Sequence, residues 1–178
     1  MSVEPQNLTS TTQNLFLVGF MASGKTTVGR TLAAQLDVPF IDLDEEIERA
    51  AGCTIAEMIQ RQGEAAFRQL ETACLREAST QKTAVISLGG GAFTQTINRE
   101  VVAQTGISVW LDAPFALCWE RIQRDAVVRP LAPTSEEAQA RYRQRVPIYE
   151  QAQIRIPVES DSTPMTLAAT IMKQLRDR

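Results

Sequence analysis

The chain contains no histidine at all. Without an imidazole side chain, Ser-His-Asp and Cys-His catalysis, histidine metal sites and histidine general bases are all excluded. Any acid–base chemistry must therefore come from carboxylates, Lys, Tyr, Cys or a bound metal.

Cysteine and long apolar runs are also scarce. The three cysteines, Cys53, Cys74 and Cys118, lie far apart and form no CxxC pair, which favours reduced thiols in a cytoplasmic protein over disulfides. No apolar run approaches the roughly 20 residues that span a bilayer. Residues 1–13 have neither the basic residues nor the apolar stretch of a targeting segment, so we expect a short, poorly ordered tail.

What is present fits one α/β domain. The 178 residues are 44% hydrophobic with a net charge of −3, which supplies a core and argues against charge-driven nucleic-acid binding. Short apolar runs alternate with longer helical patterns, which predicts a parallel sheet covered by helices. We expect strands at 15–20, 38–43, 83–88, 107–111 and 154–158, and helices at 25–36, 44–62, 64–81, 95–105, 114–124, 135–151 and 164–176.

A glycine-rich loop gives the strongest functional signal. Residues 19–26, GFMASGKT, match GxxxxGK[ST] after an apolar strand and before a helical pattern. The backbone N–H groups of such a loop and the helix N-terminus bind phosphate groups. Lys25 would reach the β- and γ-phosphates, and the Thr26 hydroxyl would bind Mg²⁺.

Two aspartates end the second expected strand. Asp42 and Asp44 share one face if the strand continues, and they should face the phosphate loop because parallel strands end at one edge. One carboxylate could hold the metal's water shell while the other contacts a substrate hydroxyl. Alternatively, the chain has already turned into the next helix, with Asp44 as its N-cap and Asp42 in a turn.

Three consecutive glycines, Gly89, Gly90 and Gly91, follow the third expected strand at the same edge. Such a run is tolerated where a ligand must approach the main chain, although a plain loop is the alternative. Arg68 lies on a helix that also carries Glu64 and Glu71. It could form a structural ion pair or offer its guanidinium fork to a substrate carboxylate.

Arginines gather further along the chain. Residues 121–145 contain six arginines against three acids, around a segment, 125–139, with two prolines. This pattern suits a mobile loop that closes over polyphosphate, whereas Arg141 and Arg143 also suit a solvated helix face.

Together these motifs resemble the shikimate kinase family over residues 14–152. The matching segments are GFMASGKTTVGRTLA, FIDLDEEIE, GCTIAEMIQRQGEAAFRQLE, SLGGGAF, RIQRDAVVRPL and RVPIYEQA. The phosphate loop has Ala-Ser where Gly-Ala is common, and the lid has RPLA where RPLL is usual.

The resemblance implies a single domain of the nucleoside-monophosphate-kinase-like class. It would be a three-layer sandwich with a five-stranded parallel sheet, a phosphate-loop kinase core, a helical substrate-binding insertion at 44–75 and a lid at 124–140. It also implies transfer of the ATP γ-phosphoryl group to the 3-hydroxyl of shikimate with Mg²⁺ as cofactor, in a cytoplasmic monomer without nucleic-acid or membrane partners.

The resemblance further implies a role for each matching residue. The ATP contacts would come from Ala22, Ser23, Gly24, Lys25, Thr26 and Thr27, from Arg121 packing on adenine and from Arg129 in the lid. Asp42 would act on Mg²⁺ through water, and Asp44 would bind shikimate hydroxyls and serve as a base. Arg68 and Arg145 would grip the shikimate carboxylate beside Gly89, Gly90 and Gly91, and the catalytic residues would be Lys25, Asp44 and Arg129.

Three other functions remain possible. A kinase for another hydroxy-acid such as gluconate would also use two arginines, but FIDLD and the glycine triplet favour shikimate. A GTPase-like switch would need an NKxD motif, which the chain lacks. A non-catalytic paralogue is disfavoured because Lys25, Thr26, Asp44 and Arg129 are all retained.

Overall fold

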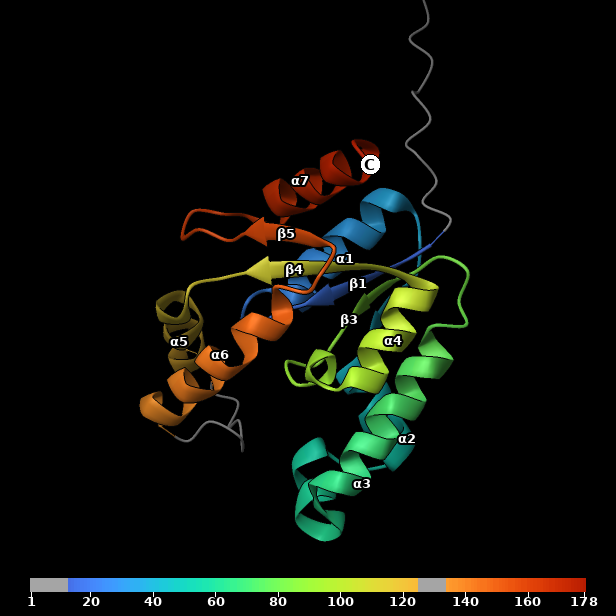
Figure 1. Cartoon of the computed structure of the whole chain (residues 1–178), viewed down its shortest axis with the longest axis vertical. Helices are drawn as coiled ribbons and strands as arrows, with labels where there is room; N and C mark the ends of the chain where they lie inside the picture. The colour runs from blue at the N-terminus through green and yellow to red at the C-terminus, as the bar shows by residue number, and fades with distance from the viewer. Residues whose placement is uncertain (1–12, 125–133) are drawn as a thin grey trace, which may run out of the picture.

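The computed structural model describes residues 13–124 and 134–178. Within them the chain forms a five-stranded parallel sheet with the order β2-β3-β1-β4-β5 (Figure 1). The strands are β1 (Asn14–Val18), β2 (Phe40–Asp42), β3 (Val85–Ser87), β4 (Gly106–Asp112) and β5 (Ile154–Pro157). All five strands overlap the runs expected from the sequence, so the predicted parallel sheet is confirmed.

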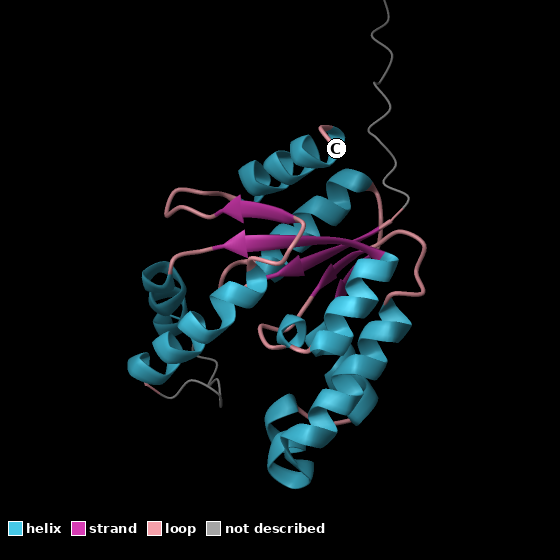
Figure 2. Ribbon diagram, viewed as in Figure 1, coloured by secondary structure: helices cyan, strands magenta, loops and turns pink. Residues whose placement is uncertain are grey.

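Helices cover both faces of this sheet, as Figure 2 shows. They are α1 (Lys25–Leu36), α2 (Leu43–Ala51), α3 (Ile55–Ala78), the 3₁₀ helix η1 (Ala92–Thr94), α4 (Thr96–Thr105), α5 (Phe115–Arg124), α6 (Ser135–Tyr149) and α7 (Pro164–Arg176). Helices α1 and α7 pack together on one face, and α3 and α4 lie on the other. The predicted three-layer arrangement is therefore confirmed.

The central strand β1 forms the middle of the core. Every residue from Asn14 to Val18 is buried, since β3 and β4 pair with its two edges and helices cover its two faces. This explains why LFLV reads as a continuous apolar run rather than an alternating one. The loop that follows β1 thus starts from the most firmly held strand of the sheet.

One expected helix is wrong in its extent. The segment predicted as a single helix, 44–62, breaks after Ala51 because Gly52 takes a left-handed conformation, with φ +66°, and ends α2. Thr54 then starts α3 with a capping box, in which its hydroxyl accepts from the Glu57 N–H while the Glu57 carboxylate accepts from the Thr54 N–H. The signals for both ends, a glycine and a Thr-x-x-Glu pattern, were present in the sequence.

The carboxyl ends of the strands share one edge of the sheet. In the parallel register Ser87 of β3 lies beside both Leu17 of β1 and Asp42 of β2. The loops after β1, β2 and β3 therefore meet there. No helix of the described residues has the length and apolarity that crossing a membrane requires. Residues 1–12 of the expected tail lie outside the described residues. Residues 125–133 of the expected lid also lie outside them, whereas residues 135–140 form the start of α6.

Candidate active site

The phosphate loop, residues 19–26, joins β1 to α1 and opens toward a cavity of about 960 Å³. Gly24 precedes α1 with φ +101°, which is a conformation that favours glycine. Ala22 also has a positive φ, +57°, and its carbonyl accepts a hydrogen bond from Arg121 of α5 at 3.2 Å. The side chain of Lys25 is buried against the loop and donates to the carbonyls of Gly19 and Phe20 at 3.0 and 2.8 Å. The loop backbone and the Lys25 side chain thus border the same part of the cavity.

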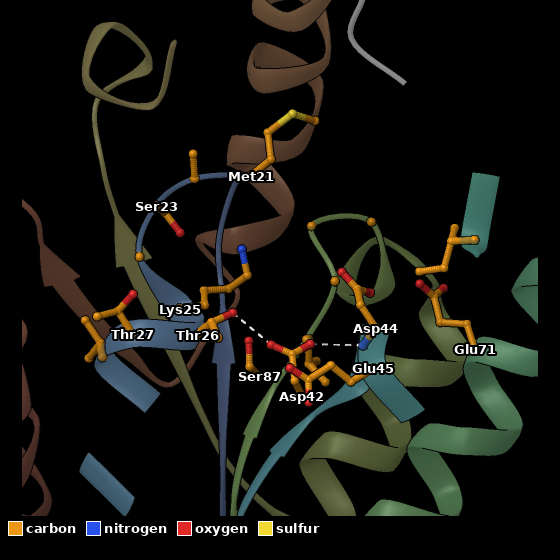
Figure 3. Close-up of a pocket in the computed structure, with 18 of the residues that line it drawn as sticks. Met21, Ser23, Lys25, Thr26, Thr27, Asp42, Asp44, Glu45, Glu71 and Ser87 are labelled. Carbon is orange, nitrogen blue, oxygen red and sulfur yellow. Dashed lines mark hydrogen bonds between the residues drawn. The ribbon is translucent and has the colours of Figure 1, made fainter. Parts of the chain in front are cut away.

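Thr26 and Asp42 form the second part of the site. The Thr26 hydroxyl donates to Asp42 Oδ2 at 2.8 Å, and Asp42 Oδ1 accepts from the Asp44 N–H at 3.1 Å (Figure 3). Asp42 is therefore the N-cap of α2, and the chain has already turned into the helix at Asp44. The strand does not continue to Asp44, so the condition for a shared strand face is not met; the expected turn into the helix is present, but its N-cap is Asp42 and not Asp44. Both aspartates nevertheless line the cavity.

The glycine triplet leaves space for charged side chains, which the sequence alone did not indicate. A Cβ built on Gly89 would lie 2.5 Å from Asp44 Oδ1, and one on Gly91 would lie 2.8 Å from Arg68 Nη2. A Cβ on Gly90 would lie 3.4 Å from Arg145 Nη1. Gly89 and Gly91 thus make room for Asp44 and Arg68, whereas a Cβ on Gly90 would be in ordinary contact with Arg145. None of the three has a positive φ, so their absent side chains matter here rather than backbone freedom.

Arg68 is held by two acids. Its Nη1 donates to both carboxylate oxygens of Glu71 at 2.9 Å, and Nη2 donates to Glu64 Oε1 at 3.1 Å. The expected ion pair is therefore present, but it does not use all five N–H donors of the guanidinium. The Glu71 side chain is 1% exposed, and desolvation raises its pKa, an effect that Arg68 partly offsets. Burying a charged acid costs desolvation free energy. A buried acid that orients an arginine beside a cavity is a common feature of binding sites.

All but one of the expected site residues line this cavity. The phosphate-loop residues 22–27, the two aspartates, the glycine triplet, Arg68, Arg121 and Arg145 surround it. Arg129 lies outside the described residues, so its contact with ATP phosphates stays a prediction. Figure 3 shows Lys25 and Thr26 on one side of the cavity and Asp44 and Glu71 toward the other.

Other residues that line the cavity could not be identified from the sequence. Ser162 and Pro164 follow β5 and join the cavity wall with Leu167. Their position after a strand at the carboxyl edge was the available signal. The chain around them matches no motif that carries chemistry on its own, so the sequence did not single them out.

A parallel sheet of this order, with a phosphate loop after its central strand and an acidic and arginine-lined cavity beside it, defines a phosphate-loop kinase. The family model for shikimate kinase matches residues 21–176. The chain belongs to the shikimate kinase family.

Individual relatives agree with that assignment. A shikimate kinase of Synechococcus sp. (strain JA-3-3Ab) is 42% identical over 164 residues, which cover 90% of this chain and 86% of the relative. The structure of shikimate kinase from Acinetobacter baumannii in complex with shikimate has a TM-score of 0.90 at 38% identity, covering 97% of this chain and 98% of that one. A gluconokinase from Sinorhizobium meliloti, at 17% identity, a TM-score of 0.63 and coverage of 93% and 94%, shares the fold alone.

Alanine substitutions in the glycine triplet should separate two functions of the cavity. We expect Gly89→Ala to lower kcat about tenfold, because the new methyl group displaces the Asp44 carboxylate without removing it. We expect Gly91→Ala to raise the KM for the acceptor about tenfold with a smaller effect on kcat, because its methyl group displaces Arg68. Steady-state kinetics with varied acceptor would measure both. If the two variants showed the same pattern, the separate placement of Asp44 and Arg68 would be wrong.

Proposed function

We propose that this protein transfers the γ-phosphoryl group of ATP to the 3-hydroxyl of shikimate, giving shikimate 3-phosphate and ADP. One observation carries the proposal. A single cavity joins a phosphate loop, with Lys25 and Thr26, to a pair of arginines beside the glycine triplet, Arg68 and Arg145. Asp44 lines the same cavity. A nucleotide triphosphate at one end and a hydroxylated carboxylic acid at the other would use all of these groups.

Lys25 and the loop backbone are the proposed phosphate-binding groups. Phosphoryl transfer depends mainly on positioning and on stabilising charge over the transferred phosphoryl oxygens. A buried ammonium group that now donates to two loop carbonyls can turn to the β- and γ-phosphates at little cost, since its charge is already desolvated. Arg121 of α5, which donates a hydrogen bond to the Ala22 carbonyl, is proposed to contact the nucleotide.

Mg²⁺ fits the pair formed by Thr26 and Asp42. A hydroxyl and a carboxylate oxygen 2.8 Å apart are the hard oxygen donors that Mg²⁺ prefers, and this ion usually takes its other ligands from water and substrate phosphates. In the described residues no cluster of three or more acidic, Cys or His side chains could hold a metal ion alone. The ion would neutralise charge on the phosphates when bound.

Asp44, Arg68 and Arg145 are the proposed acceptor-binding groups. The two guanidinium groups would bind the shikimate carboxylate, Arg68 through donors that Glu71 and Glu64 leave available. Asp44, in the first turn of α2, would accept a hydrogen bond from the attacking hydroxyl and take its proton as the new phosphate ester forms.

We also propose the segment 44–75 as the acceptor-binding insertion, since α2 and most of α3 supply Asp44 and Arg68. We propose that the protein acts as a monomer, because the phosphate loop and both acceptor arginines line one cavity of a single chain. Free thiols at Cys53, Cys74 and Cys118 suit the reducing cytoplasm, which is the proposed location.

A coupled assay of ADP release tests the proposal. The purified protein with ATP and Mg²⁺ is given shikimate, gluconate or no acceptor. We expect fast release with shikimate and slow release in the other two reactions. Equal rates with gluconate and shikimate, or rates that do not depend on an acceptor, would refute the assignment of shikimate.

A further inference from the structure

The hydroxyl of Tyr149 contacts the acceptor end of the cavity. Tyr149 is the last residue of α6 and lies four positions after Arg145, about one helical turn away. It is 1% exposed, and its hydroxyl donates to the carbonyl of Gly90, the middle glycine of the triplet. The Arg145 side chain lies beside the same glycine, since a Cβ built on Gly90 would be 3.4 Å from Arg145 Nη1. Since a phenol has one donor, the O–H of Tyr149 is used by the glycine triplet, next to Arg145.

Burial keeps this arrangement constant. Desolvation raises the pKa of Tyr149 to about 12, with Arg145 opposing the rise, so the phenol remains a neutral donor at ordinary pH. The ring packs against Trp110 of β4, with the ring centroids 6.2 Å apart, so the hydroxyl has little freedom to turn away. A rigid aromatic group thus ties α6 to the loop after β3.

Arg145 needs such a tie more than Arg68 does. Two acids fix Arg68, whereas Arg145 lies beside Gly90 with its Cζ 6.0 Å from the Phe20 ring centroid. A long arginine side chain loses much rotamer freedom when it binds an anion, and prior ordering reduces that loss. A neutral hydroxyl that fixes the glycine beside the guanidinium can provide the ordering without neutralising the charge of Arg145, as an acid would.

We infer that Tyr149 is a positioning residue for acceptor binding: its hydrogen bond to the Gly90 carbonyl fixes this glycine beside the Arg145 guanidinium and thereby sets the affinity for the acceptor's carboxylate. The inference rests on the proposed function, because it assumes that Arg145 binds that carboxylate. Tyr149 itself touches no reacting atom in this scheme, so the chemical step should be nearly insensitive to it.

The same helix offers a matched control. Tyr142, seven residues before Tyr149 on α6, also donates its hydroxyl to a backbone carbonyl, that of Ala113, at 3.1 Å. It too packs among aromatic rings, those of Phe20 and Phe115. Its carbonyl partner lies just after β4, away from the glycine triplet. Tyr142→Phe therefore removes an equivalent hydroxyl without touching the unit formed by Tyr149, Arg145 and Gly90.

The first experiment compares the KM and kcat of Tyr149→Phe and Tyr142→Phe with those of the wild type. We expect Tyr149→Phe to raise the KM for shikimate about five- to tenfold, the usual effect of losing one buried hydrogen bond at a binding group. The KM for ATP and the kcat at saturating shikimate should change less than about twofold. Tyr142→Phe should leave both KM values unchanged. Equal changes in the two variants, or an unchanged KM for shikimate in Tyr149→Phe, would overturn the inference.

A second experiment asks whether the effect passes through the carboxylate. The preference for shikimate over its uncharged methyl ester should fall in Tyr149→Phe, since a mobile Arg145 discriminates charge less well. In a double-mutant cycle with Arg145→Lys, the two changes should be far from additive, because each disrupts the same contact. An unchanged preference for the acid together with additive effects would show that Tyr149 has only a structural role. A wild-type protein that does not turn over shikimate would instead refute the proposed function, so the two failures can be told apart.

Discussion

Lys25→Met should reduce kcat by about 10²- to 10³-fold or more, the loss that follows removal of one preorganised donor for transition-state charge. The methionine side chain has a similar length but no charge, so the β- and γ-phosphates lose their ammonium partner. Lys25 already sits desolvated against the loop, so its charge is fully effective there and is poorly replaced by water. Steady-state assays at saturating ATP and shikimate would measure the loss.

The matched control is Lys82→Met, which removes an exposed lysine before β3. Its kcat should equal that of the wild type. Circular dichroism and thermal unfolding must show that Lys25→Met keeps its fold, because the Gly19 and Phe20 carbonyls lose a donor. A folded Lys25→Met protein with near-normal turnover would end the assignment of Lys25 to the chemical step.

Loss of either arginine of the acceptor end should weaken shikimate binding about 10- to 100-fold while ADP affinity stays the same, since each is proposed to donate charge-assisted hydrogen bonds to the carboxylate. Arg145→Ala tests the arginine on α6. For Arg68 the better variant is Arg68→Lys, because it keeps a positive charge beside the buried Glu71 and removes only the fork geometry. Calorimetric titration of shikimate and of ADP into each variant gives both affinities.

Arg143→Ala and Arg143→Lys provide the controls for the two arginine variants. Arg143 is exposed on α6, two residues from Arg145, so Arg143→Ala changes the net charge as Arg145→Ala does and Arg143→Lys keeps it as Arg68→Lys does, in both cases outside the residues that line the cavity. Their shikimate affinity should be that of the wild type. An Arg68→Lys protein with unchanged shikimate affinity would mean that Arg68 serves only its ion pairs with Glu64 and Glu71.

The sheet was predictable mainly because its inner strands β1, β3 and β4 are buried on both faces over most of their length. Runs such as LFLV and VWL are continuously apolar, so they are found without knowing their partners. The break between α2 and α3 was missed although Gly52 and Thr54 signalled it, because the apolar pattern continues through it. Periodicity reports which face is buried and is weak at marking where a helix ends.

The site was predictable where a motif dictates local backbone geometry and less so where contacts are long-range. The phosphate loop follows from its own glycines and lysine. The pairing of Gly89 with Asp44, by contrast, joins loops that are far apart in the sequence, and the role of Tyr149 depends on a carbonyl 59 positions away. Such pairings follow from the strand order, which no local pattern in one sequence encodes.

The strand order also determines when each strand can pair with its neighbours during synthesis on the ribosome. β1 is the first strand to leave the ribosome, yet its neighbours in the sheet are β3 and β4, the latter ending at Asp112. At about 5–20 residues per second, the apolar side chains of Leu15, Phe16 and Leu17 wait several seconds or more for both partners. Helix α7, which packs on α1, is synthesised last of all. The phosphate loop is thus translated early, but the sheet that holds it is completed late. A nascent chain that stalls before β4 leaves at least one edge of β1 unpaired. Such a chain should bind ribosome-associated chaperones.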